Sequence, residues 1–314
     1  MADATSRRDF MRLAGAAAAG MAASTRAFGA EDAPSAAGPR RNVIFILIDD
    51  QRYDALGMLN PFFDTPALDA LAGNGILFDR AFVATSLCSP SRASILSGQY
   101  AHTHGVLNNS TLLPPGTPTF PQELQKAGYR TGFTGKWHMG GSSDAPRPGF
   151  DRWVSFRGQG VYNNPTFNID GERVEREGYV TDLITDYSEE FIRESKDAPF
   201  FLYMSHKAVH GDFYPAERYE GSYADRTYPY PASMADTDEN YAGKPAWVRA
   251  QRRSWHGVDG MYNNKTDFDK FARDYAETLK AVDDSVARIV KTLDELGLLD
   301  STLILFTSDN GFQF

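Results

Sequence analysis

The chain has 314 residues, of which 42% are hydrophobic and 23% are charged, a composition that argues against disorder and suffices for one large α/β core or two modest domains. Its formal charge of −9 argues against a general nucleic-acid-binding surface, which requires clustered Lys and Arg. The single cysteine, Cys88, excludes an internal disulfide. This residue is therefore either a small buried apolar side chain or a chemically special one.

Residues 1–29 have the pattern of a twin-arginine export signal. Paired arginines and a nearby aromatic residue precede the Ala-rich run 13–23, which is too short to span a bilayer as a stable helix. Cleavage is expected after Ala27 or Gly29, and residues 30–41 are predicted to be a linker. This interpretation predicts a periplasmic or secreted protein, the twin-arginine translocon as a partner, and no stable membrane span. A frayed terminus before an Ala-rich helix is the alternative.

Several short apolar runs predict buried strands that end in polar residues. The continuous run at 42–48 (NVIFILI) is typical of a strand buried on both faces of a parallel sheet. Further strands are predicted at 129–134, 199–205 and 302–307. Helices are predicted at 121–127 and, with sustained three- and four-residue spacing of apolar residues, at 271–296.

The alternation of strands and helices predicts an α/β fold, in which ligands bind beyond the carboxyl ends of the strands. Residues 147–198 and 211–267 show no sustained period and are rich in Gly, Pro, Tyr and charge. We expect both stretches to form long, partly ordered insertions around the site.

Two pairs of oxygen-bearing side chains follow predicted strands far apart in the chain. Asp49 and Asp50 follow the first strand, and Asp309 and Asn310 follow the last. Calcium and magnesium prefer such carboxylate and amide ligands, whereas zinc normally takes more His or Cys. The pairs therefore predict a calcium or magnesium site, although each pair alone also matches ordinary turn sequences.

The segment Cys88–Gly98 (CSPSRASILSG) resembles the signature of the sulfatase family, within the alkaline-phosphatase-like superfamily. In that signature a cysteine lies two residues before Pro and four before Arg, and a Leu-Ser/Thr-Gly ending follows. The resemblance extends over nearly all of 42–314, including GKWH at 135–138 and SDNG at 308–311. It implies a catalytic domain with a mixed, largely parallel central sheet flanked by helices, most similar to bacterial N-acetylglucosamine-6-sulfatase-type enzymes.

The resemblance also implies a reaction at residue 88. A formylglycine-generating enzyme would convert Cys88 to formylglycine, and one hydroxyl of its hydrated form would attack the sulfur of a sulfated carbohydrate. The second hydroxyl then allows sulfate to leave, so that the covalent step turns over. A calcium or magnesium ion would act as a Lewis acid. The implied metal ligands are Asp49, Asp50, residue 88 (Cys88 before conversion), Asp309 and Asn310.

Four further residues receive roles from the resemblance. Arg92 would hold the formylglycine, Lys136 would bind the sulfate oxygens, and His138 would accept a proton from the diol. His210 would protonate the leaving alcohol, as a histidine with a near-neutral pKa can. Because valine replaces the family's usual proline before His210, nearby His206 remains an alternative for this role.

Family members usually continue beyond the SDNG motif with a further sulfate-contacting lysine and a smaller C-terminal domain. We therefore expect this sequence, which ends at Phe314, to represent a C-terminally truncated catalytic domain. Two alternatives to a carbohydrate sulfatase remain. One is a phosphonate monoester or phosphodiester hydrolase with the same signature, and the other is an inactive, truncated sulfatase-like fragment.

Overall fold

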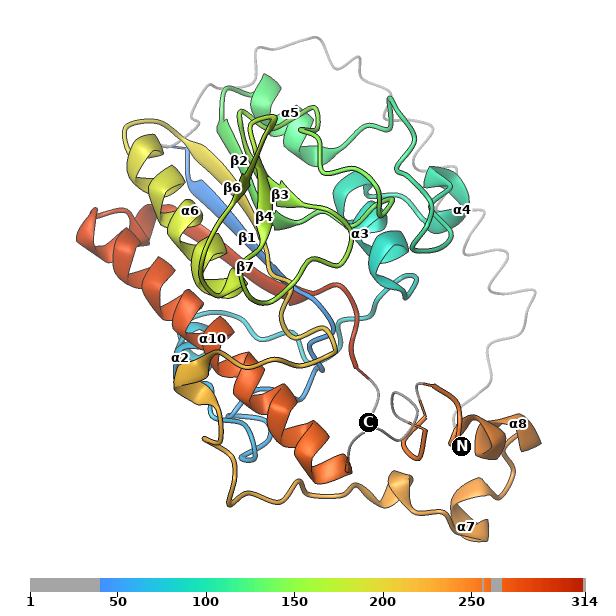
Figure 1. Cartoon of the computed structure of the whole chain (residues 1–314). Coiled ribbons are helices and arrows are strands. Elements are labelled where there is room, and N and C mark those ends of the chain that lie inside the picture. Colours follow the sequence, from blue (N-terminus) through green and yellow to red (C-terminus); the bar gives the residue numbers. More distant parts are fainter. Residues whose placement is uncertain (1–39, 256, 261–266, 313–314) are drawn as a thin grey trace, which may run out of the picture. The chain divides into compact units, whose positions relative to one another are not determined.

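The computed structural model describes residues 40–255, 257–260 and 267–312 (Figure 1). The predicted export signal and nearly all of the predicted linker lie outside these residues. Residues 41–314 belong to one compact unit. In the described ranges, no helix has the length and apolar character needed to cross a membrane.

In the described part of the chain, seven strands form one mixed sheet in the order β5-β4-β3-β2-β6-β1-β7. Strands β3, β2, β6, β1 and β7 are mutually parallel, and β4 is antiparallel to both of its neighbours. The predicted mixed, largely parallel sheet is confirmed. The strands are β1 (Asn42–Ile48), β2 (Arg130–Lys136), β3 (Arg152–Phe156), β4 (Thr166–Ile169), β5 (Glu172–Glu175), β6 (Phe200–Ser205) and β7 (Thr302–Ser308).

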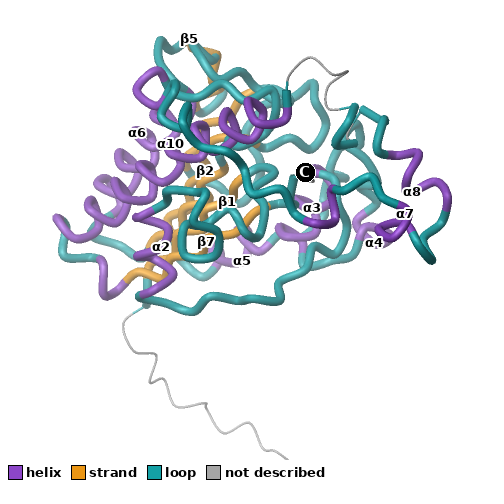
Figure 2. Tube along the Cα trace, turned by 90° about the horizontal axis from the view of Figure 1, so that it is seen from below, coloured by secondary structure: helices purple, strands orange, loops and turns teal. Residues whose placement is uncertain are grey.

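Helices cover both faces of this sheet (Figures 1 and 2). One face packs against α2, α6 and α10, and the other packs against α3 and α5. The helices are α2 (Pro66–Gly73), α3 (Cys88–Ser97), α4 (Ala101–His104), α5 (Phe120–Lys126), α6 (Val180–Ser195), α7 (Asp238–Tyr241), α8 (Ala246–Gln251) and α10 (Phe268–Glu295), with short 3₁₀ turns η1 (Glu217–Tyr219), η2 (Ala232–Met234) and η3 (Leu299–Ser301).

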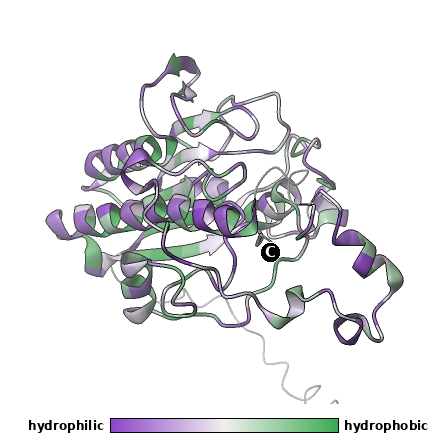
Figure 3. Ribbon diagram, turned by 60° about the horizontal axis from the view of Figure 1, so that its bottom comes forward, coloured by the Kyte–Doolittle hydropathy of each residue, from purple (hydrophilic) through white to green (hydrophobic). Residues whose placement is uncertain are grey.

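The apolar run at residues 43–48 of β1 reflects burial on two sides. Ile44 and Ile46 pack in the core under α6 and α10, whereas Phe45 and Leu47 face the core under α3 and α5. Successive strand residues point to opposite faces, so a strand covered on both faces needs apolar side chains at every position. Colouring by hydropathy shows the apolar strands at the centre and the two-sided character of the long helix α10 (Figure 3).

The predicted long helix is confirmed as α10, which begins three residues earlier than expected. Asp267 caps it, because its side chain accepts a hydrogen bond from the backbone N–H of Lys270 at 2.6 Å. Its buried stripe, which includes Phe271 and Leu279, packs against α6 and α2. Gly297, at φ 66°, follows the helix in a conformation that glycine adopts without strain.

The expectation of an irregular insertion at 147–198 is wrong. This stretch forms β3, the β4–β5 hairpin and the 16-residue helix α6. The buried face of α6 includes Thr181, Thr185 and Ser188, so small polar residues interrupt the apolar repeat by which amphipathic helices are predicted. The second predicted insertion, at 211–267, has only the short elements η1, η2, α7 and α8 within its described residues.

Candidate active site

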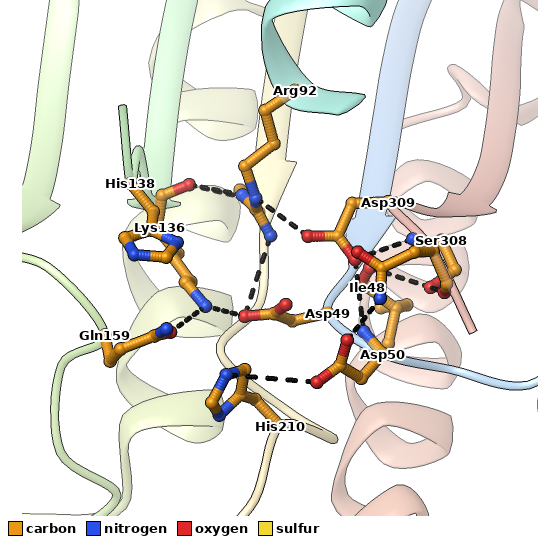
Figure 4. Close-up of polar contacts among 12 residues, drawn as sticks. Ile48, Asp49, Asp50, Arg92, Lys136, His138, Gln159, His210, Ser308 and Asp309 are labelled. Carbon is orange, nitrogen blue, oxygen red and sulfur yellow. Dashed lines mark hydrogen bonds and ion pairs between the residues drawn. The ribbon is translucent and has the colours of Figure 1, made fainter. Parts of the chain in front are cut away.

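The carboxyl ends of four parallel strands bring the predicted site residues together (Figure 4). Ile48 of β1 is in register with Ser308 of β7, so Asp49 and Asp309 leave the sheet side by side. Ser205 at the end of β6 is in register with Gly135 of β2, next to Lys136. Because β2 continues to Lys136, this lysine lies on the strand itself, two residues beyond the predicted strand end.

Three aspartates form the acidic centre of the site. One carboxylate oxygen from each of Asp49, Asp50 and Asp309 lies within 4.8 Å of those of the other two. The backbone N–H groups of Asp50 and Asn310 donate to Asp309 Oδ1 at 3.1 and 2.8 Å, and Asn310 Nδ2 donates to Asp50 Oδ1. These bonds hold the two ligand pairs predicted from sequence in a single cluster.

The chemistry of this cluster fits a hard divalent cation. Asp49 Oδ1 and Asn310 Oδ1 are buried and have no hydrogen-bond partner among the described residues. Burial, followed by the charge of Asp309, raises the pKa of Asp50 to about 7, because neighbouring carboxylates repel one another. A calcium or magnesium ion would neutralise this repulsion through oxygen ligands of the type it prefers.

Cys88 is the first residue of α3 and is only 5% exposed. Its sulfur, a carboxylate oxygen of Asp49 and a ring nitrogen of His210 all lie within 4.8 Å of one another. Burial and the charges of Asp309 and Asp50 raise the pKa of the Cys88 thiol, so the unmodified side chain remains protonated at neutral pH. Since the thiolate is the reactive form of cysteine, an unmodified Cys88 is a poor nucleophile in this position.

Arg92 organises the centre from α3. It is 1% exposed, and its Nε donates to Asp309 Oδ2 at 2.9 Å. Its Nη1 donates to the backbone carbonyl of Lys136 and to Ser205 Oγ, each at 2.7 Å, while its Nη2 lies 3.8 Å from Asp49 Oδ2. One planar guanidinium thus connects α3 with the ends of four strands.

Lys136 and His138 flank the buried Trp137 in the chain and lie near each other at the site (Figure 4). The ammonium of Lys136 contacts the carboxylate of Asp49 and the side-chain oxygen of Gln159, and burial lowers its pKa well below the ordinary value. Burial and the charges of Lys136, Arg92 and Lys207 lower the pKa of His138 to about 2, and its Nδ1 has no partner in the described ranges. His138 is therefore neutral at physiological pH.

The structure separates the two candidate histidines after β6. His210 Nε2 lies 3.9 Å from Asp50 Oδ2, at the acidic centre. His206 is fully buried against α10 instead, where its Nε2 lies 3.2 Å from Ser285 Oγ. Burial, then the charges of Lys136 and Lys207, lower the pKa of His210 to about 2. The geometry therefore favours His210 over His206 as the histidine that faces a substrate.

A buried tyrosine stabilises the turn that contains Asp50 and Arg52. Tyr275 of α10 donates from its hydroxyl to the backbone carbonyl of Asp50 at 3.1 Å and accepts from the backbone N–H of Arg52 at 2.8 Å. Its ring packs edge-on against Phe213, with the centroids 5.2 Å apart. Because Asp50 has a φ of 62°, which is unusual for a residue with a side chain, these contacts help to hold a strained turn.

Three residues of the site were not predicted from the sequence. Ser205 and Lys207 lie at and just beyond the end of β6, so their position in the chain could have revealed them. Gln159 lies in a stretch without a detectable motif, and only the fold brings it to Lys136. By contrast, every residue assigned a role from sequence lies at this edge of the sheet.

Comparison with known proteins identifies the family. The family model described as Sulfatase matches residues 41–314, and the chain therefore belongs to the sulfatase family. It is 30% identical over 332 residues to the N-acetylglucosamine-6-O-sulfatase of Bacteroides thetaiotaomicron, a match that covers 87% of this chain and 58% of that protein. The chain thus spans little more than half the length of this relative.

Solved structures confirm the alkaline-phosphatase-like fold. A structure in complex with its substrate D-glucosamine-2-N,6-O-disulfate matches with a TM-score of 0.73 and 29% identity, covering 87% of this chain and 66% of the other. A phosphonate monoester hydrolase from Silicibacter pomeroyi matches with a TM-score of 0.68 and 25% identity, covering 87% and 63% of the two chains.

Proposed function

We propose that this protein is a sulfuric ester hydrolase that removes sulfate from a sulfated carbohydrate. The observation that carries the proposal is the position of Cys88, at the first turn of α3 and beside the three aspartates of a cation site. Cys88 belongs to neither of the two apolar clusters of the described core, so apolar packing does not explain its burial. The activity for which the Bacteroides relative is named and the substrate in the bound structure support a 6-sulfated glucosamine as the substrate.

The proposed nucleophile is formylglycine, made from Cys88 by a formylglycine-generating enzyme. When formed, this group supplies a hydrated aldehyde whose hydroxyl attacks sulfur, and the proposed cation, calcium or magnesium, polarises the sulfate oxygens. Asp49, Asp50, Asp309 and Asn310 would hold the cation, together with residue 88. The N-terminus of α3 adds a partial positive charge that favours an anion at the same position.

The surrounding residues would control charge and protons. Arg92 keeps Asp309 oriented and, with Lys136, offsets the negative charge of the sulfate. A bound sulfate raises the pKa of nearby histidines, because an anion favours their charged form. His210 would then be able to protonate the leaving alcohol, while His138 would accept a proton as sulfate departs.

Export follows from the N-terminal pattern. We propose that residues 1–29 direct a folded protein through the twin-arginine translocon, so that modification of Cys88 and metal loading precede translocation. The catalytic domain at 42–314 would then act in the periplasm or outside the cell, where large sulfated carbohydrates are encountered.

Hydrolysis of defined substrates tests the proposal. The protein is produced together with a formylglycine-generating enzyme, loaded with calcium or magnesium, and assayed on N-acetylglucosamine 6-sulfate, an aryl sulfate and an aryl phosphodiester. We expect release of sulfate, its abolition by chelation, and its loss in Cys88→Ala. Sulfate release by the Cys88→Ala variant at the wild-type rate would refute the proposed chemistry.

The second candidate is hydrolysis of phosphonate monoesters or phosphodiesters. It is favoured by the structural match to the Silicibacter pomeroyi hydrolase, which has an activity of this kind in its name. The assay separates the two functions directly. A higher kcat/KM on the aryl phosphodiester than on both sulfate esters would favour the second candidate.

A further inference from the structure

Among the described residues, Lys207 is a buried cation without a salt-bridge partner. It lies two residues beyond β6 and is 4% exposed, with its Nζ 4.6 Å from the ring centroid of Tyr162. Within the described ranges, no carboxylate oxygen lies within 4.0 Å of its ammonium and no hydrogen bond is formed by it. Asp212 and Asp50 attract it only from beyond that distance.

The protein environment compensates this charge incompletely. An ammonium removed from water loses strong hydration, and a buried ammonium normally gains hydrogen bonds or a direct ion pair in exchange. The face of the Tyr162 ring provides a cation–π contact, which is weaker than a charge-assisted hydrogen bond to an anion. The position is therefore suited to an anion supplied from outside the chain.

The other two cations at the centre are already engaged. Lys136 contacts Asp49 and Gln159, and Arg92 donates to Asp309 and to two further oxygens. Of the Arg92 nitrogens, only Nη2 has no hydrogen-bond partner among the described residues. In the described structure, Lys207 differs from both in having no such contact to give up.

The backbone fixes Lys207 beside the acidic centre. The segment that follows Lys207 is hydrogen-bonded to the backbone at Asp49, one of the proposed metal ligands. Asp49 N donates to the carbonyl of Ala208 at 3.0 Å, and Val209 N donates to the carbonyl of Asp49 at 2.7 Å. Tyr162, whose ring faces the ammonium, donates from its hydroxyl to the carbonyl of His210 at 2.6 Å. These contacts connect Lys207, Tyr162 and the proposed general acid His210.

We infer that Lys207 binds the sulfate group of the substrate while it is transferred, as an anion-binding residue additional to Lys136 and Arg92. This inference rests on the proposed function, because it takes the substrate to be a sulfate ester. During transfer, negative charge is carried by the sulfate oxygens, and a positioned ammonium stabilises that charge in a site shielded from water.

Binding of inorganic sulfate tests this role without requiring turnover. The affinity of the calcium-loaded protein for sulfate is measured by calorimetry in the wild type, in Lys207→Met and in Lys280→Met. Lys280 is a matched control, because its ammonium lies 5.2 Å from the ring centroid of Tyr219 but also has an ion-pair partner, Asp64, at 2.6 Å.

We expect Lys207→Met to weaken sulfate binding roughly tenfold to a hundredfold, the range for one hydrogen bond to a charged group. Lys280→Met should bind sulfate like the wild type, and neutral N-acetylglucosamine should bind all three proteins equally. Equal sulfate affinity in the wild type and Lys207→Met, or no sulfate binding by the wild type, would overturn the inference. A purely structural lysine would change the melting temperature but leave sulfate affinity unaltered.

Two further observations keep the test decisive. If circular dichroism shows that Lys207→Met does not fold, Lys207→Arg and Lys207→Gln are compared instead. Lys207→Arg retains the positive charge and should keep its affinity for sulfate, whereas the neutral Lys207→Gln should lose it. Equal sulfate binding by Lys207→Arg and Lys207→Gln would overturn the inference. If the wild type binds sulfate through Lys207 yet hydrolyses no sulfate ester, the proposed sulfatase activity is wrong, whereas the anion-binding role of Lys207 is supported. If the wild type hydrolyses sulfate esters and Lys207→Met retains its KM and its sulfate affinity, only the inference fails.

Discussion

Replacing Arg92 with lysine isolates the contribution of guanidinium geometry to the site. The substitution keeps the positive charge and removes the planar fork that reaches Asp309 Oδ2 at 2.9 Å and both the Lys136 carbonyl and Ser205 Oγ at 2.7 Å. A shorter side chain that ends in one ammonium nitrogen does not reproduce the planar fork, and we expect it to keep one of these three contacts. Arg92→Lys therefore removes two buried, charge-assisted hydrogen bonds.

The magnitude follows from the number of bonds lost. A hydrogen bond to a charged group contributes about 1.5–3 kcal/mol, so the variant should lose about 3–6 kcal/mol of unfolding free energy. This is a large share of the roughly 5–15 kcal/mol that stabilises a typical domain. Equilibrium unfolding in guanidinium chloride, with a chelator present to exclude metal binding, measures the difference.

Arg193→Lys is the control, because Arg193 forms an ion pair with Glu295 at 3.0 Å in which both side chains are about half exposed. Exposed pairs contribute little, so this variant should lose less than about 1 kcal/mol. If Arg92→Lys also loses less than about 1 kcal/mol of unfolding free energy, the organising role assigned to the guanidinium is refuted. The loss of two buried hydrogen bonds to a charged group should cost more than this.

Three other outcomes are expected. Tyr275→Phe should weaken calcium affinity measured by calorimetry, because it removes both bonds that hold the turn at Asp50; unchanged affinity would contradict this. Calcium should raise the melting temperature of the wild type and should do so much less in Asp309→Asn; equal increases would count against the cation site. Burial lowers the pKa of His206 to about 3 from 6.5, so below pH 6.5 the unfolded state binds the proton and stability falls with acidification, by about 2–3 kcal/mol between pH 6.5 and 4.5. Urea unfolding of His206→Gln at those pH values should show a smaller loss of unfolding free energy than the wild type. An identical pH dependence of the two proteins would disprove that burial of His206 causes the loss.

The parts of the fold predicted correctly are those in which local pattern and tertiary burial agree. The strand at 42–48 is buried on both faces, so every position after Asn42 is apolar, and the amphipathic α10 keeps its spacing over many turns. Helix α6 was missed because it buries Thr185 and Ser188, which bond to Ser285 and Thr134 instead of contributing to an apolar stripe. These hydrogen-bonded pairs form between α6 and its neighbours α10 and β2, so they can be recognised only in the folded structure.

The site was largely predictable because its residues follow strands that share one edge. Asp49 and Asp309, separated by most of the chain, are joined by the pairing of β1 with β7, as their places after strands suggested. The choice between His206 and His210 needed the direction in which each side chain leaves the chain after β6, and this direction depends on the turn that follows. Gln159 could not be predicted, since a loop contact leaves no periodic trace in sequence.

Mass spectrometry of the tryptic peptide spanning residues 81–92 tests the central claim most directly, because every proposed step depends on the chemical state of residue 88. In protein produced with a formylglycine-generating enzyme, we predict that this peptide carries an aldehyde at residue 88 in place of the thiol. Finding only the unmodified cysteine in protein that releases sulfate from its ester would contradict the account.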